Sequence, residues 1–169
     1  MSEKIINKVA ESELLQFDLQ DLYVKGERVL FDLKSFLFEE LILKEKDFRE
    51  QIKNHDWKKY ADKFVTITCT ADAIVPTWAF MLVASQLQPF AKKNVFGDLN
   101  KLEEELFRDR ISKINVQEYN DKRVSIKGCS NIYVPLSAYV EITVKLRPVV
   151  KSIMYGEACS TVPLYKRKD

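Results

Sequence analysis

The hydrophobic pattern of the second half of the chain predicts two strand–helix–strand units. The stretches KFVTIT and KRVSIK are rich in β-branched residues, which is typical of buried strands. Each is followed by a loop and by a helical pattern that begins at Pro76 or Pro135, since proline suits the first helical turn. A second short strand with a glycine at its turn then follows. This order of elements predicts βαβ units with right-handed crossovers.

These two units align without a gap when the chain is shifted by 59 residues, which places 62–98 over 121–157. Convergence of two α/β units under the same packing rules is an alternative, but the number of identities favours duplication. We therefore expect an α/β fold in which two repeated βαβ units form a largely parallel or mixed sheet with flanking helices. The eleven identical pairs are Asp62/Asp121, Lys63/Lys122, Val65/Val124, Ile67/Ile126, Val75/Val134, Pro76/Pro135, Ala79/Ala138, Leu87/Leu146, Pro89/Pro148, Lys92/Lys151 and Gly97/Gly156.

The remaining segments show mostly helical spacing of apolar residues. A helix is expected between the repeats, with apolar positions at Leu99, Leu102, Leu106, Ile111 and Ile114. Residues 1–61 are expected to be a mainly helical region, although GERVLFDL is compatible with a strand or a helix start. Its expected core positions are Phe36, Leu37, Leu41, Phe48 and Ile52. The whole chain, 1–169, is predicted to form a single domain.

Composition narrows the classes of function without naming one. The chain has 169 residues, of which 46% are hydrophobic and 31% charged, and its formal net charge is +2. Such a balance indicates a globular protein with no strongly charged partner. The basic end YKRKD is expected to be solvated, and no nucleic-acid partner is expected because no basic stripe is interleaved with aromatic residues.

The pattern also predicts a cytoplasmic protein without a membrane partner. No apolar stretch is long enough to span a bilayer, which takes about 20 residues, and the N-terminus lacks the pattern of a signal peptide. In the cytoplasm the three cysteines are expected to stay reduced.

Each of the three cysteines, Cys69, Cys129 and Cys159, precedes a Val-Pro pair. Ligand sites of parallel α/β sheets lie beyond the carboxyl ends of the strands, where Cys69 and Cys129 are predicted. Two units side by side would bring both to one edge, and Cys159 follows the last strand at that edge. We therefore expect the three thiols to converge.

Three thiolates suit zinc, iron or an iron–sulfur cluster. A fourth ligand is available from Asp72, Asp98, Glu157, His55 or a group outside the chain, and the metal-site candidates are Cys69, Cys129, Cys159, Asp72 and Glu157. The absence of a C-x-x-C pair weakens this hypothesis. Burial of the cysteines as small apolar residues is the alternative. His55 is more compatible with an exposed or capping position than with a ligand, and Asp98 and Glu157 are equally compatible with turns.

Four stretches together resemble a bacterial family known as domain-of-unknown-function family 2480. They are ILKEKDFREQIKNHDWKKY, ADAIVPTWAFML, DKRVSIKGCSN and YGEACSTVPLYKRK. The resemblance implies a small cytoplasmic protein without an established activity and without catalytic residues to carry over. It also implies an association with iron–sulfur assembly genes.

Three functional hypotheses follow. The first is an accessory protein that binds a metal ion or iron–sulfur species through the three cysteines, with iron–sulfur assembly proteins as partners and a homodimer as a further candidate assembly. The second is a thiol-dependent or small-anion-binding enzyme with a cysteine at a helix N-terminus. The third is a non-catalytic interaction module with buried cysteines. A nucleotide-binding loop is not expected, since the chain has only four glycines and no phosphate-loop motif.

Overall fold

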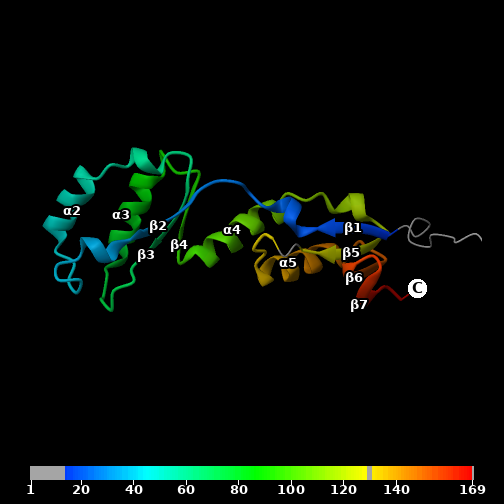
Figure 1. The fold of residues 1–169 in the computed structure, drawn as a ribbon. Coiled ribbons are helices and arrows are strands. Elements are labelled where there is room, and N and C mark those ends of the chain that lie inside the picture. Colours follow the sequence, from blue (N-terminus) through cyan, green and yellow to red (C-terminus); the bar gives the residue numbers. More distant parts are fainter. Residues whose placement is uncertain (1–13, 129–130, 169) are drawn as a thin grey trace, which may run out of the picture. The chain divides into compact units, whose positions relative to one another are not determined.

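The chain forms two compact units, one of which is inserted into the other along the sequence (Figure 1). The structure is a computed structural model that describes residues 14–128 and 131–168. Unit 1 comprises Met1–Val24 and Leu106–Asp169, and unit 2 comprises Lys25–Glu105. Unit 2 therefore separates the first strand of unit 1 from the rest of that unit.

Unit 2 contains a three-stranded parallel sheet in the order β2-β3-β4. Its strands are β2 (Arg28–Asp32), β3 (Phe64–Thr68) and β4 (Lys93–Phe96), and its helices are α2 (Glu45–Asn54), α3 (Thr77–Leu87) and the short 3-10 helices η2 (Leu33–Phe36) and η3 (Lys58–Tyr60). Spatial order follows chain order, so right-handed crossovers place α2 and α3 on the same face of the sheet.

The core of unit 2 lies between that face and the two helices. The strand residues Phe31, Val65 and Ile67 are buried there. Phe48 and Ile52 from α2, and Ala79, Val83 and Leu87 from α3, complete this cluster. The spacing of three and four residues along each helix explains why one stripe of the helix is buried.

Unit 1 repeats this arrangement and adds one antiparallel strand, giving the sheet order β1-β5-β6-β7. Val124, Ile126 and Ile153 of the sheet share a core cluster with Phe107, Ile111, Ile142 and Leu146. The elements are β1 (Leu14–Asp18), β5 (Arg123–Lys127), β6 (Ser152–Glu157), β7 (Ser160–Lys166), α5 (Leu136–Leu146), η1 (Leu19–Leu22) and η4 (Val116–Tyr119), together with the C-terminal part of α4 (Leu99–Ser112), which begins in unit 2.

The duplication is larger than the aligned sequence segments suggest. The end of α4 corresponds to α2, with the identical pairs Phe48/Phe107, Arg49/Arg108, Ile52/Ile111 and Tyr60/Tyr119 at the same shift of 59 residues. The first strands also match, because both β1 and β2 end in Phe-Asp and are followed by the leucine that begins a 3-10 helix.

Buried hydroxyl groups repeat in the same way. Thr66 Oγ1 donates a hydrogen bond to the Gly97 carbonyl at 2.5 Å, and Ser125 Oγ donates to the Gly156 carbonyl at 2.6 Å. Both residues are fully buried, and the paired hydroxyl removes the cost of burying a polar group inside a sheet.

The α/β class, the two βαβ units and the largely parallel strands are confirmed. The helices α3 and α5 begin directly after Pro76 and Pro135 and end before Pro89 and Pro148. The expectation of one common sheet is wrong, because each βαβ unit pairs with its own N-terminal strand, β2 or β1.

The expected mainly helical region is also wrong in its described part. Residues 14–61 include β1 and β2 as well as α2, because strands so short leave a periodicity that helix and strand share. Leu41, an expected core residue, is 59% exposed on the turn before α2. The basic C-terminal stretch is not simply a solvated end, since residues up to Lys166 form β7.

Candidate functional site

The two described cysteines lie on different sheets. Cys69 follows β3 in unit 2, and Cys159 lies in the turn between β6 and β7 in unit 1. Both are free thiols, Cys69 half-buried and Cys159 exposed, and Cys129 lies outside the described residues. The expected convergence on one sheet edge is therefore not found, since that expectation required a common sheet.

The described residues contain no group of three or more His, Cys, Asp or Glu side chains that could hold a metal ion. Asp72 is exposed in the loop after Cys69. Glu157 is held by two neighbours, because it accepts hydrogen bonds from Lys127 Nζ at 3.1 Å and from Gln16 Nε2 at 3.0 Å. The hydrogen bond from Lys127, supported by the one from Gln16, lowers the pKa of Glu157. The zinc or iron–sulfur cofactor stays a prediction.

His55 is part of an aromatic cluster in unit 2. Its ring lies 4.7 Å from that of Trp57 and 5.5 Å from that of Phe31, measured between centroids. Its Nε2 lies 3.1 Å from the Tyr60 hydroxyl. Burial, helped by the charge of Lys59, lowers the pKa of His55, and burial raises the pKa of Tyr60 to about 12. These contacts make His55 a packing residue at the end of α2.

A pair of compensating residues explains the position of Cys69. Gly128 is its equivalent in the repeat, and a Cβ at Gly128 would overlap the hydroxyl oxygen of Tyr139. In unit 2 the tyrosine is replaced by Phe80, which leaves that space for the Cys69 side chain. Cys69 packs against the apolar cluster of unit 2, so its surroundings favour a packing role.

Asp32 at the end of β2 anchors the loop that follows Cys69. Its carboxylate accepts hydrogen bonds from Thr70 Oγ1 at 2.5 Å, from Thr70 N at 3.0 Å and from Lys34 N at 2.9 Å. Partial burial alone would raise the pKa of Asp32, but the bonds from Thr70 and Lys34 outweigh it and lower the pKa below its usual value of 3.8.

The substitution Asp32→Asn is expected to lower the free energy of unfolding at neutral pH by about 1 kcal/mol. A lowered folded-state pKa means that the unfolded chain binds more protons, so the carboxylate stabilises the fold above pH 3.8, and this contribution is lost as the pH falls through the lower folded value. Urea unfolding at several pH values should therefore show that the free energy of unfolding falls less steeply at acid pH in the variant than in the unmodified protein. Asp72→Asn, in the same loop, is the control. The same fall at acid pH for Asp32→Asn and the unmodified protein would contradict this role.

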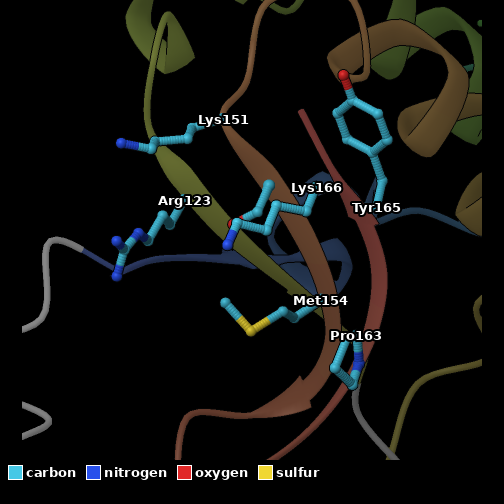
Figure 2. Close-up of a pocket in the computed structure, with 7 residues that line it drawn as sticks. Arg123, Lys151, Met154, Pro163, Tyr165 and Lys166 are labelled. Atoms are coloured by element: carbon cyan, nitrogen blue, oxygen red, sulfur yellow. The ribbon is translucent and has the colours of Figure 1, made fainter. Parts of the chain in front are cut away.

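A basic pocket of about 260 Å³ lies in unit 1 at the amino ends of β5 and β6 (Figure 2). All the charged residues that line it are cations, namely Arg123, Lys151 and Lys166. The other lining residues are Ser152, Met154, Pro163 and Tyr165. The pocket thus combines three positive charges with a largely apolar floor.

The register of the sheet builds this pocket. Arg123 of β5 lies opposite Ser152 of β6, which lies opposite Lys166 of β7. Side chains two residues apart on a strand share a face, so Met154 lies on the same face as Ser152. Figure 2 shows Arg123, Lys166 and Met154 together on this side of the sheet, whereas the Tyr165 ring contributes to the core on the other side. We call this side, which faces away from the core, the far face.

Among the described residues, the carboxylate nearest to the pocket is bound by another cation. Within the part of the chain that the structure describes, Arg123 and Lys166 have no ion-pair partner. The nearby carboxylate of Asp121 is bound by Arg167, and this hydrogen bond, with the charge of Lys151 as a smaller contribution, lowers the pKa of Asp121. Three cations around one hollow repel one another, and an anion placed there would relieve this repulsion.

Sequence reasoning missed this pocket for a physical reason. Its cations come from three separate places along the chain, 123, 151 and 166, and none belongs to a motif. The only signal was the basic end of the chain, whose role depends on its pairing with β6. The pocket also lies at the amino ends of the parallel strands, opposite to the edge at which the cysteines were expected.

Comparisons with known proteins identify a family and no activity. A family model described as a protein of unknown function (DUF2480) matches residues 3–167. No curated protein and no solved structure matches the chain. Among the described residues, no helix has both the length and the apolar character that crossing a bilayer requires.

Proposed function

Since the chain belongs to the family of unknown function DUF2480, we propose its function from geometry: it is a non-catalytic binding module that holds anionic groups in the basic pocket of unit 1. The observation that carries this proposal is the convergence of Arg123, Lys151 and Lys166 on one pocket without a lining carboxylate. This proposal follows the third hypothesis, an interaction module, and not the first.

The chemistry of the lining defines what fits. The planar guanidinium of Arg123 suits paired oxygens of a carboxylate or phosphate, and the two ammonium groups act as additional point charges. Met154 and Pro163 offer apolar surface beside these charges. A bound group therefore consists of an oxyanion with a short apolar portion next to it.

Neutralising the pocket is expected to weaken pyrophosphate binding about tenfold or more, because each charge-assisted hydrogen bond contributes about 1.5–3 kcal/mol. The variant is Arg123→Gln combined with Lys166→Gln, and the measurement is isothermal titration of pyrophosphate at low salt. Low salt is needed because salt weakens the attraction between exposed charges, with a screening length of about 10 Å at 0.1 M ionic strength.

A matched control removes the same charge elsewhere. Lys46→Gln combined with Lys53→Gln alters two exposed lysines of α2 in unit 2 and should leave the affinity unchanged. Equal affinities for the pocket variant and this control would overturn the proposal. Thermal unfolding of both variants checks that the fold is intact.

The metal hypothesis stays a separate proposal, together with its zinc or iron–sulfur cofactor and its iron–sulfur assembly partners. What supports it is the presence of free thiols at Cys69 and Cys159. Metal and sulfide analysis of protein purified without oxygen, beside a Cys129→Ser variant, is the measurement that tests it.

A further inference from the structure

The two units differ in what covers the face of the sheet that is turned away from the core. In unit 2 this face carries Arg28 and Leu30 of β2 and Lys93 of β4, and the first part of α4 lies against it. Glu103 of α4 accepts hydrogen bonds from Arg28 Nε at 2.6 Å and Nη2 at 3.3 Å.

Two further contacts fix the course of this helix over the sheet of unit 2. Lys93 Nζ donates a hydrogen bond to the Glu105 carbonyl at 3.3 Å. The start of α4 follows the carboxyl end of β4, and there Leu99 and Asn100 line a pocket together with Leu30 from the middle of β2. The helix therefore runs from the carboxyl ends of the strands back to their amino ends. It thereby places the Glu103 carboxylate on Arg28 and the Glu105 carbonyl on Lys93.

Unit 1 diverges at the point where α4 begins in unit 2. After Gly97, Asp98 caps α4 by accepting a hydrogen bond from Lys101 N at 2.7 Å. After the equivalent Gly156, Glu157 binds Lys127, and the chain turns back as the antiparallel strand β7. Within the described residues, no helix covers the far face of unit 1.

This face of unit 1, over which no described helix lies, carries cations at the corresponding end of its strands. Arg123 and Lys166 lie in the register row at the amino ends of β5 and β6, as Arg28 and Lys93 lie in the row at the amino ends of β2 and β4. Toward the middle of the sheet, Met154 provides apolar surface between Gln16 and Ser125 on one side and Pro163 on the other. A helix with a glutamate-rich C-terminal half and apolar residues below it is complementary to this pattern.

We infer that the far face of unit 1 is a docking surface for an acidic amphipathic helix of a partner protein, laid across β5 and β6 as the start of α4 is laid across the sheet of unit 2. The inference rests on the proposed anion-binding function and names its ligand. Carboxylates of the partner helix occupy the pocket at Arg123 and Lys166, and its apolar stripe covers Met154. The arrangement is a helix-on-sheet form of groove recognition in which charge sets the position.

The chain itself supplies the probe for a test. A synthetic peptide with the sequence of residues 98–112 carries Glu103, which binds Arg28 in unit 2, together with the neighbouring Glu104 and Glu105. It is titrated into the intact protein labelled with ¹³C in its methionine methyl groups. The chain has three methionines, so Met154 reports on the far face, and Met81, exposed on α3 of unit 2, is an internal control.

The expected result is a saturable shift of the Met154 methyl signal while that of Met81 stays in place. A peptide with Glu103, Glu104 and Glu105 replaced by glutamine should bind about tenfold more weakly or worse. The protein variant Arg123→Glu combined with Lys166→Glu should lose the shift, and Met154→Leu assigns the signal. Circular dichroism of the protein variants verifies that they are folded.

Each of the other outcomes contradicts either the docking inference alone or the proposed function as well. If pyrophosphate binds and the peptide does not, the helix inference fails while the proposed function stands; if neither binds, both fail. Equal binding of the glutamine peptide removes the role of charge and contradicts the inference. A Met154 signal that changes with protein concentration alone would assign the face to a second copy. Peptide binding only after deletion of residues 1–13 would assign it to the chain's own N-terminal segment. Either result would contradict the inference that a helix of a partner protein binds this face.

Discussion

Replacing Phe48 with alanine is expected to lower the free energy of unfolding by about 3–5 kcal/mol. Phe48 is fully buried on α2, and its ring lies 6.0 Å from that of Phe36 and 5.8 Å from that of Trp78. Removal of the ring loses apolar burial and leaves a cavity between α2, α3 and the sheet. This loss is a large fraction of the free energy of unfolding of a native protein, which is about 5–15 kcal/mol. Urea unfolding followed by circular dichroism measures it.

Phe38→Ala is the matched control for this substitution. Phe38 is 45% exposed on the turn before α2 and contacts the Lys44 ammonium over its ring, so its removal should cost less than about 1 kcal/mol. Phe107→Ala, at the equivalent position of unit 1, should cost as much as Phe48→Ala, since both rings are buried. Similar small losses for Phe48→Ala and Phe38→Ala would show that Phe48 does not belong to the core.

The second large effect concerns Gly128, where alanine is expected to destabilise the protein by about 1–3 kcal/mol through overpacking. The added Cβ would overlap the Tyr139 hydroxyl oxygen and approach the ring carbon that bears it to 3.0 Å. The Tyr139 ring packs edge-on against the Tyr155 ring, whose centroid lies 6.1 Å away, so moving it aside would cost part of this contact. Thermal or urea unfolding of Gly128→Ala measures the cost.

A double-mutant cycle with Tyr139→Phe isolates the overlap. The phenylalanine restores the arrangement of unit 2, where Phe80 lies 5.2 Å from Phe96 and Cys69 takes the place of Gly128. In the Tyr139→Phe background the Gly128→Ala cost should fall to less than about 0.5 kcal/mol, giving a coupling of about 1 kcal/mol or more. Additive costs would refute the view that Cys69 and Phe80 compensate for one another.

The inserted order of the units explains why much of the duplication escapes a linear alignment. The equivalent strands β1 and β2, with the 3-10 helices η1 and η2 that follow them, are separated by a shift of 14 residues, and the later equivalent elements by 59. A single shift therefore aligns the βαβ portion and not the first strands. The aspartates Asp18 and Asp32, which end these strands, both accept a hydrogen bond from the backbone two residues later. This local motif determines how each strand turns into its 3-10 helix.

The functional proposals rest on a difference between the copies and not on their common features. In unit 2 the start of α4 pairs Glu103 with Arg28 and offers a main-chain carbonyl to Lys93, whereas the corresponding face of unit 1 carries a basic pocket. Common features such as the Thr66 and Ser125 hydrogen bonds maintain the fold. A duplicated unit can thus serve as the internal reference against which an unpaired surface becomes visible.

Local sequence patterns were sufficient to predict the elements of the repeated half. Runs of β-branched residues predicted β3 and β5, and the spacing between Pro76 and Pro89, or Pro135 and Pro148, predicted α3 and α5, because these signals depend on neighbouring residues. The family was also visible in the sequence, and the match over residues 3–167 confirms it.

The pairing of the strands, by contrast, depends on long-range packing. This pairing also determines where the candidate site lies. Pairing of β1 with β5 and of β2 with β3 joins residues far apart in the chain, so two sheets formed where one was expected and the cysteines Cys69 and Cys159 lie on different ones. Pairing of β7 with β6 brought Lys166 beside Arg123 and made a pocket from cations that no motif connects. Strand register is set by packing of the whole sheet and is not encoded in a local pattern.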